Sequence, residues 1–246
     1  MGRTRARTVA ACCLALAALA AAAGCTGARA ARPVHHAPER KAAAPVSQGP
    51  RWLVTHVPAG TRQAIVVTGP SMTATTGELS AYERPAGGGW QRVRGPAPVR
   101  LGRGGFTWHP REGASATPAG VFALPLAFGW ADPGVRLPWR TATGDSWWVD
   151  DPTSPLYDTW QDGPADGRWK SAERLHITPY RLAVSIATNP DHAPYGGSAI
   201  FLHLPIGDAT EGCVTVDEPT LRWVLGWLDP AAQPRAVMGP AADLDG

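Results

Sequence analysis

Short apolar runs separated by clusters of Gly, Pro, Asp and Asn dominate the chain from residue 52 onward. Runs of four to eight residues bounded by such turn residues are typical of β-strands. We expect strands at 64–67, 79–83, 90–93, 120–124, 182–188, 199–203, 213–216 and 235–238, and a hairpin loop at 85–89. Many short strands with turn signals predict a mainly β domain, built as a sandwich or a barrel-like sheet.

One segment departs from this pattern and has helical spacing. Its apolar residues recur every three or four positions, at Leu221, Val224, Leu225 and Leu228. Asp217 can cap the first turn, in which Pro219 is tolerated, and an Asp-Pro pair at 229–230 ends the pattern. We therefore expect one amphipathic helix directly after the segment 213–216, with its apolar face packed on the core.

The first 25 residues differ in composition from the rest of the chain. Arg3, Arg5 and Arg7 precede an unbroken apolar run at 9–23, which is too short to span a bilayer as a stable helix. This layout is that of an export signal. Its end, Ala22-Ala23-Gly24-Cys25, resembles the lipobox of bacterial lipoproteins, in which the cysteine is acylated. Ordinary cleavage within the alanine run is the alternative.

Residues 1–25 are thus expected to be an export signal of the lipoprotein type, with Cys25 as the lipidation site. The location would be the outer face of the cytoplasmic membrane or the cell wall. Residues 26–50 are rich in Ala, Pro, Arg and Lys without an apolar period, so we expect a disordered tether there. Residues 51–246 remain as one folded domain.

The charge of the chain gives no sign of a nucleic-acid partner. The formal net charge is +3, and the signal itself contributes three arginines and no acidic residue. The remainder is therefore electrically balanced, and the basic isoelectric point does not indicate nucleic-acid binding.

Removal of the signal determines which cysteines remain to form a disulfide. Cys12 and Cys13 leave with the signal, and Cys25 would carry lipid, so Cys213 has no disulfide partner. An unpaired cysteine in an exported protein indicates a reactive thiol or intermolecular pairing. The other explanation is a small side chain buried in the core.

The neighbours of Cys213 favour a reactive thiol. His203 ends the apolar run 199–202, and the intervening turn would let its imidazole meet the thiol. Gly212 allows close backbone approach, so amides beside Cys213 could stabilise an oxyanion with help from the Thr210 hydroxyl. His203 could hold a thiolate and later protonate a leaving amine.

These residues resemble the signature of the L,D-transpeptidases with a YkuD-like catalytic domain. That signature is an upstream histidine followed by Ser/Thr-His-Gly-Cys, matched here by His203 and Thr210-Glu211-Gly212-Cys213. The segment Thr117-Pro118-Ala119-Gly120-Val121-Phe122 looks like the family's Thr-Pro-x-Gly-x-Phe. Further segments at 102–105, 148–152, 171–175 and 197–203 resemble an actinobacterial envelope subgroup, and the likeness extends over about residues 60–240.

The resemblance implies a β-sandwich-like YkuD-type domain with few short helices. It also implies a cysteine-dependent acyltransferase that attacks a peptidoglycan stem peptide, expels D-Ala and passes the acyl group to an amine, in cell-wall biogenesis and maintenance of cell shape. Neither a metal nor an organic cofactor is needed, and a monomer is expected. The expected catalytic residues are Cys213, His203, Gly212 and Thr210, and the expected substrate-binding residues are Ser198, Glu211 and Trp148.

Three departures from the family pattern affect the expected substrate. Glu211 replaces the histidine of the tetrad, where a carboxylate facing the thiol would oppose thiolate formation. Thr215 replaces a common arginine, and the loop between His203 and Thr210 is short. An L,D-carboxypeptidase or endopeptidase with the same site, or a non-catalytic cell-wall-binding lipoprotein, are the alternatives.

Two further questions stay open in the sequence. The partner that orients the His203 imidazole could be Asp208, Asn189 or a backbone carbonyl. Six tryptophans cluster at Trp130, Trp139, Trp147, Trp148, Trp160 and Trp169. They could line a groove for a polymer or fill the core beneath irregular loops.

Overall fold

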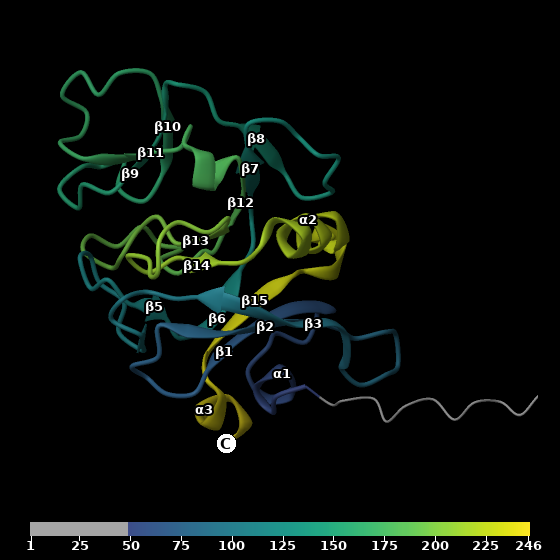
Figure 1. The fold of residues 1–246 in the computed structure, drawn as a ribbon. Coiled ribbons are helices and arrows are strands. Elements are labelled where there is room, and N and C mark those ends of the chain that lie inside the picture. Colours follow the sequence, from purple (N-terminus) through teal and green to yellow (C-terminus); the bar gives the residue numbers. More distant parts are fainter. Residues whose placement is uncertain (1–48) are drawn as a thin grey trace, which may run out of the picture. The chain divides into compact units, whose positions relative to one another are not determined.

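The computed structural model describes residues 49–246, which form a mainly β domain (Figure 1). The expected signal at 1–25, with Cys25, and nearly all of the expected tether at 26–50 lie outside the described residues. Within residues 49–246, no helix combines the length and the apolar character needed to cross a bilayer.

The elements come in the following order. The first half of the domain contains α1 (Trp52–Thr55), β1 (Gln63–Gly69), β2 (Thr76–Glu83), β3 (Gln91–Arg100), β4 (Phe106–Thr107), β5 (Thr117–Pro118), β6 (Gly120–Ala123), β7 (Ala127–Gly129) and β8 (Trp139–Thr141). The second half contains β9 (Ser146–Val149), β10 (Trp160–Asp162), β11 (Ala172–Arg174), the 3-10 helix η1 (Thr178–Tyr180), β12 (Leu182–Ser185), β13 (Phe201–His203), β14 (Val214–Thr215), α2 (Glu218–Trp227), the 3-10 helix η2 (Pro230–Ala232), β15 (Arg235–Pro240) and α3 (Ala241–Asp245).

One large mixed sheet organises the domain. Its strand order is β6-β15-β1-β2-β3-β14-β13-β12-β7-β8. The two halves of this sheet meet at β3 and β14 through the pair Thr215 and Arg100. The half around β1 and the half around β13 form separate layers (Figure 1), and Ile65 of β1 and Leu202 of β13 belong to the same buried cluster. The expected sandwich-like β fold is confirmed as one long sheet whose two halves enclose a common core.

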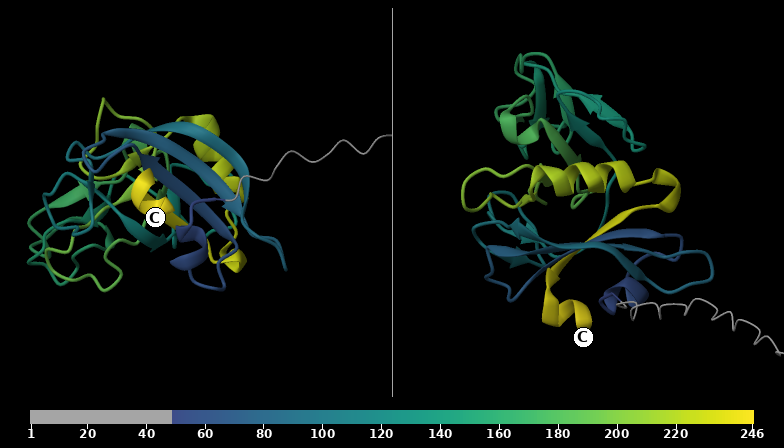
Figure 2. Two further views of the ribbon diagram at one scale, coloured as in Figure 1. Left: turned by 90° about the horizontal axis from the view of Figure 1, so that it is seen from below. Right: turned by 45° about the vertical axis from the view of Figure 1, so that its right-hand side comes forward.

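Helix α2 closes this core at one side (Figure 2). The Asp217 side chain accepts a hydrogen bond from the Thr220 amide, as expected for the cap. Leu221, Val224 and Leu225 are fully buried in the main apolar cluster. Burial of each of these side chains contributes roughly 1.5–3 kcal/mol. The helix therefore holds the preceding strand β14, and with it Cys213, against the core.

Strands β13 and β14 position the two residues of the expected site. They pair in parallel, with Leu202 opposite Val214 and His203 opposite Thr215. His203 is the last residue of β13, and Cys213 directly precedes β14. The loop between the strands carries the chain from the end of β13 back to its beginning, so Cys213 lies beside Phe201 on the neighbouring strand.

The apolar runs located eight strands correctly, but the two strands beside Cys213 are shorter than expected. The strand expected at 199–203 begins at Phe201, because Ala199 has a left-handed backbone with φ 54°. The strand expected at 213–216 contains only Val214–Thr215, and Gly212 before it has φ 141°. Both irregularities lie next to the thiol.

A second sheet of three strands, β10-β9-β11, lies at one end of the domain. Strand β11 carries Glu173, and η1 after it carries Tyr180. This sheet is short and rich in tryptophan, with Trp160 opposite Trp148 in its register. It supplies one wall of the cavity described below.

Candidate active site

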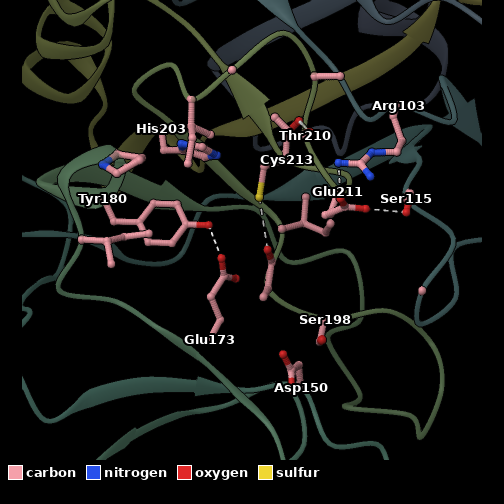
Figure 3. A pocket seen from close by; sticks show the side chains of 18 of the residues that line it. Arg103, Ser115, Asp150, Glu173, Tyr180, Ser198, His203, Thr210, Glu211 and Cys213 are labelled. Carbon is pink, nitrogen blue, oxygen red and sulfur yellow. Dashed lines mark hydrogen bonds and ion pairs between the residues drawn. The ribbon is translucent and has the colours of Figure 1, made fainter.

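A cavity of about 690 Å3 brings the expected catalytic residues together (Figure 3). Cys213, His203 and Thr210 line it, together with Ser198 and Glu211. Tyr180 and Glu173 form part of the same wall, although sequence analysis assigned no role to either. Trp148 lines a smaller cavity of about 250 Å3 instead.

The Cys213 thiol is buried and protonated. Its side chain is 7% exposed; Sγ accepts from the Phe201 amide at 3.3 Å and donates to the Ala199 carbonyl at 3.3 Å. Burial raises the pKa of the thiol well above its usual range, and the Glu173 carboxylate raises it further. Formation of a thiolate therefore needs a nearby group that takes the proton.

His203 presents one nitrogen for such proton transfer. Its Nδ1 donates to the Leu204 carbonyl at 2.7 Å, because a carbonyl oxygen can only accept. Burial lowers the pKa of His203 to about 4, so the ring is neutral near pH 7 and its Nε2 has a free lone pair. The group that orients the imidazole is thus a backbone carbonyl, rather than Asp208 or Asn189.

Asn189 has a different task in the structure. Its side-chain amide donates to the carbonyls of Ala193 and Gly197, and its oxygen accepts from the Ala193 amide. These hydrogen bonds hold the loop that leads to Ser198 and β13. Asn189 therefore shapes the chain entering the site without touching His203.

Residues 210–213, here called the nucleophile turn, are held by the Thr210 side chain. Thr210 Oγ1 donates to the Cys213 carbonyl at 2.6 Å and accepts from the Gly212 amide at 3.1 Å. The Gly212 amide is therefore already engaged, which leaves the Cys213 amide as the candidate oxyanion donor. A Cβ on Gly212 would lie 2.9 Å from Ile200 and 3.0 Å from the Ala116 carbonyl, so the turn requires glycine at this position.

Glu211 points away from the thiol. Its carboxylate pairs with Arg103 and accepts a hydrogen bond from Ser115 at 2.5 Å (Figure 3). The segment 102–105 that carries Arg103 is joined to the expected Thr117–Phe122 motif, since the Thr117 hydroxyl accepts from the Gly102 amide at 2.8 Å. The carboxylate in the family's histidine position is thus bound at the cavity rim.

Ser198 lies in the cavity wall, whereas Trp148 is fixed outside it. Ser198 Oγ donates to Glu112 at 2.8 Å, and Tyr157 donates to the same carboxylate. The Trp148 indole donates to Asp158 at 2.7 Å, and its ring packs edge-on against Phe201. The structure therefore supports a place for Ser198 beside a substrate but gives Trp148 a packing role.

The other clustered tryptophans divide between core and surface. Trp160 and Trp169 are buried, Trp139 and Trp147 are partly buried, and Trp130 is 41% exposed. None of the six lines the cavity that contains Cys213. Of the two alternatives, filling of the space beneath irregular loops fits Trp160 and Trp169.

Glu173 and Tyr180 are the functional candidates that the sequence analysis missed. The Tyr180 hydroxyl donates to Glu173, and the Tyr180 ring lies edge-on against His203 with 4.8 Å between the ring centroids. Burial raises the pKa of Glu173 to about 7. The signal in the sequence for a partly buried carboxylate was a glutamate inside a tryptophan-rich stretch, two residues before the apolar Leu175.

Thr215, which replaces the family's arginine, has a buried hydroxyl whose effect on stability can be tested. Its side chain is 1% exposed, and its hydroxyl has no hydrogen-bond partner in the described part of the chain. Replacement Thr215→Val removes this unpaired hydroxyl at nearly constant shape, so we expect stabilisation by about 1 kcal/mol. A thermal melt should show an increase of roughly 2–4 °C.

A matched threonine should respond in the opposite direction. Thr117 is also fully buried, but its hydroxyl accepts from the Gly102 amide. Thr117→Val should therefore lower stability by about 1–3 kcal/mol, because a buried donor is left unpaired. A lower melting temperature for Thr215→Val would contradict the assignment of an unpaired hydroxyl at that position.

Comparison with known proteins gives one match. The family model described as YkuD, L,D-transpeptidase catalytic domain, matches residues 86–237. No curated protein and no solved structure matches the chain. The matched range includes His203, the nucleophile turn and the Thr117–Phe122 motif. The chain therefore belongs to the YkuD family of L,D-transpeptidase catalytic domains, whose members act on the peptides of peptidoglycan.

Proposed function

We propose that this protein is an exported L,D-transpeptidase that forms an acyl-enzyme on Cys213. The observation that carries the proposal is the shared cavity: Cys213 and His203 line one space of about 690 Å3, which is large enough for part of a peptide. Membership of a family that acts on peptidoglycan peptides supports stem peptides as the substrate. The signal at 1–25, with lipid on Cys25, would place the enzyme at the outer face of the cytoplasmic membrane or in the cell wall.

The reaction has two acyl-transfer steps. The Cys213 sulfur, after loss of its proton, attacks the peptide carbonyl carbon, and the C–N bond to D-Ala breaks as that nitrogen gains a proton. An acceptor amine then attacks the thioester carbon, loses a proton and releases the thiolate. His203 Nε2 takes the proton of the thiol and passes it to the leaving nitrogen; in the second step it takes the proton of the acceptor amine and returns it to the sulfur. The Cys213 amide faces the developing oxyanion.

The position of Glu211 favours an enzyme over a binding protein with a degenerate site. The carboxylate that replaces the family's histidine pairs with Arg103, and burial and Glu173, rather than Glu211, raise the pKa of Cys213. A nucleophile, a neutral imidazole and a turn that requires glycine remain together around the cavity. Such an arrangement is suited to acyl chemistry.

The test is covalent capture of the acyl donor. Incubation with a carbapenem, whose strained lactam is an acyl donor, should add the mass of one ring-opened molecule to Cys213. The variant Cys213→Ala should show no adduct. An unmodified wild-type Cys213, or an equal adduct in the variant, would contradict the proposal.

The products from purified stem tetrapeptides decide what accepts the acyl group. Cross-linked dimers with release of D-Ala support the transpeptidase. Tripeptide and free D-Ala in the presence of ample acceptor would instead assign an L,D-carboxypeptidase, since water would be the acceptor. Binding to sacculi without turnover of any stem peptide would point to the cell-wall-binding alternative.

A further inference from the structure

The Cys213 sulfur is held between two backbone groups of one short segment, residues 199–201. The Phe201 amide donates to Sγ at 3.3 Å, and Sγ donates to the Ala199 carbonyl at 3.3 Å (Figure 3). These two bonds fix the rotamer of the thiol, because both must break before the sulfur rotates away. The backbone conformation of residues 199–201 therefore sets where the nucleophile points.

Ala199 has a backbone conformation that its own side chain disfavours. Its φ is 54°, in the left-handed region. A residue with a Cβ populates this region roughly 5- to 30-fold less than the right-handed one, because the Cβ approaches the following carbonyl oxygen. A contact from outside the segment must therefore hold Ala199 in this conformation.

The side chain of Asp158 provides this contact. Its Oδ1 accepts from the Ala199 amide at 3.1 Å and from the Trp148 indole at 2.7 Å. Asp158 is 8% exposed, so water cannot readily take its place as the acceptor for either donor. The left-handed turn at Ala199 thus depends on one buried carboxylate oxygen.

The small sheet β10-β9-β11 holds Asp158 in place. The Asp158 amide donates to the Val149 carbonyl at 2.8 Å, and the Val149 amide donates to the Thr159 carbonyl at 2.9 Å. Asp158 and its neighbour are therefore both tied to β9, whose Val149 is fully buried. Hydrogen bonds form a continuous path from β9 through Asp158 and Ala199 to the sulfur of Cys213.

We propose that Asp158 is a positioning residue for the nucleophile. By accepting from the Ala199 amide, it keeps residue 199 left-handed, and this conformation aims the Ala199 carbonyl at the thiol. The sulfur is thereby held at the cavity wall, from which it attacks the peptide carbonyl. Asp158 lies outside the residues that line this cavity and acts on Cys213 through Ala199.

This inference rests on the proposed acyl transfer for its effect on rate, and His203 remains the base that takes the thiol proton. Asp158 contributes an acceptor oxygen. Its second oxygen, Oδ2, lies 3.9 Å from His192 Nδ1, which is beyond hydrogen-bond distance. Asparagine would offer the same Oδ1 to Ala199 and Trp148, so the proposed role predicts that Asp158→Asn is tolerated.

The first measurement is the S–H stretching vibration of Cys213 by infrared difference spectroscopy, assigned as the band lost in Cys213→Ala. A hydrogen bond from the thiol to a carbonyl lowers the frequency of this band. Asp158→Gly should shift it to higher frequency, and Asp158→Asn should leave it in place. Glycine is the suitable replacement because Asp158 itself has φ 55°, which alanine would disfavour. An unshifted band in Asp158→Gly would overturn the inference.

The second measurement is the rate of carbapenem adduct formation on Cys213. Asp158→Gly should be about tenfold slower than the wild type, because a misplaced nucleophile reaches the attack geometry less often. Asp158→Asn should stay within about twofold of the wild type, since its side-chain oxygen restores the acceptor. If Asp158→Asn were as slow as Asp158→Gly, the negative charge rather than the hydrogen bond would matter, and the inference would be wrong.

Replacement of Ala199 with glycine tests whether Asp158 acts through the backbone of residue 199. Glycine adopts positive φ about as readily as negative φ, so the turn should depend less on the Asp158 acceptor. In the Ala199→Gly background, Asp158→Gly should slow adduct formation by about threefold or less. An equal loss of rate with alanine and with glycine at position 199 would exclude this path.

Ala199→Val makes the same test with Asp158 intact, should Asp158→Gly fail to fold. A β-branched residue strongly disfavours the left-handed region, so the S–H band should shift in the same direction and the adduct should form more slowly. A folded Ala199→Val variant with the wild-type band and rate would contradict the proposed role of the turn.

Asp151 supplies a matched control for stability. It is also buried, and it accepts from the amides of Thr153 at 2.9 Å and Lys170 at 2.8 Å, outside the residues that line the Cys213 cavity. Asp151→Gly should lower the melting temperature without changing the rate of adduct formation well below the melt. Equal slowing in Asp151→Gly and Asp158→Gly would assign the loss to a general loosening of the small sheet and overturn the inference.

The two measurements distinguish failure of this inference from failure of the proposed function. If the wild type forms the carbapenem adduct and Asp158→Gly keeps the wild-type S–H band, the positioning role is rejected and the transpeptidase is retained. If the band shifts in Asp158→Gly but the wild type forms no adduct, the positioning of the thiol is retained and the proposed acyl transfer is rejected.

Discussion

Replacement of His203 with asparagine should lower acyl transfer to an amine about 100- to 10,000-fold, the range expected for loss of a general acid–base group. The asparagine amide can still donate to the Leu204 carbonyl in place of His203 Nδ1. What it lacks is the free Nε2 lone pair. The measurement is the rate of cross-linked dimer formation from a tetrapeptide donor at saturating acceptor.

The same variant needs a control for its fold. A circular-dichroism melt controls for the smaller side chain, because His203 is 2% exposed and its ring fills space beside Tyr180. Transfer within twofold of the wild-type rate, in a folded variant, would remove His203 from the chemistry.

The protonated, buried thiol gives this site a low resting reactivity. The Ala199 carbonyl accepts from Cys213, and burial opposes ionisation. In the proposed reaction, the thiol loses its proton as the sulfur attacks the peptide carbonyl carbon. A thiol that stays protonated is also less readily oxidised, and Cys213 is the single free cysteine in the described residues.

Local periodicity was sufficient to locate the main strands and helix α2. In β1 and β15, for example, apolar side chains follow one another along the chain, and nearly every residue of these strands is buried. Strands β8 and β10 carry no such run. Strand β8 is held by pairing with β7, and β10 by pairing with β9; the exposed Arg140–Asp162 ion pair adds a contact between them.

The candidate site was predictable where its residues are close in the chain. His203 and Cys213 are separated by a short loop, so their spacing already indicated a meeting. Glu173 and Tyr180 come from β11 and η1, and only the packing of the small sheet against β13 brings them to the thiol. The sequence shows that residue 211 is charged, but the direction in which the Glu211 carboxylate points depends on its ion pair with Arg103, more than 100 residues away.

Replacement of Thr210 with valine should lower the free energy of unfolding by about 2–4 kcal/mol, since the Cys213 carbonyl and the Gly212 amide each lose a buried partner. The melting temperature should fall by roughly 5–15 °C. Acylation of Cys213 should fall as well, because the nucleophile turn would lose the hydroxyl that sets its shape. Denaturant titration and carbapenem adduct formation measure the two effects.

Serine at the same position supplies the matched control. Thr210→Ser keeps the hydroxyl and loses one methyl group, whose burial is worth about 1 kcal/mol, so its adduct formation should stay near the wild-type rate. Equal losses in both variants would show that packing of the methyl group, rather than the two hydrogen bonds, maintains the turn. A wild-type melt for Thr210→Val would contradict the role of Thr210 altogether, because its side chain is 6% exposed and water cannot readily replace both bonds.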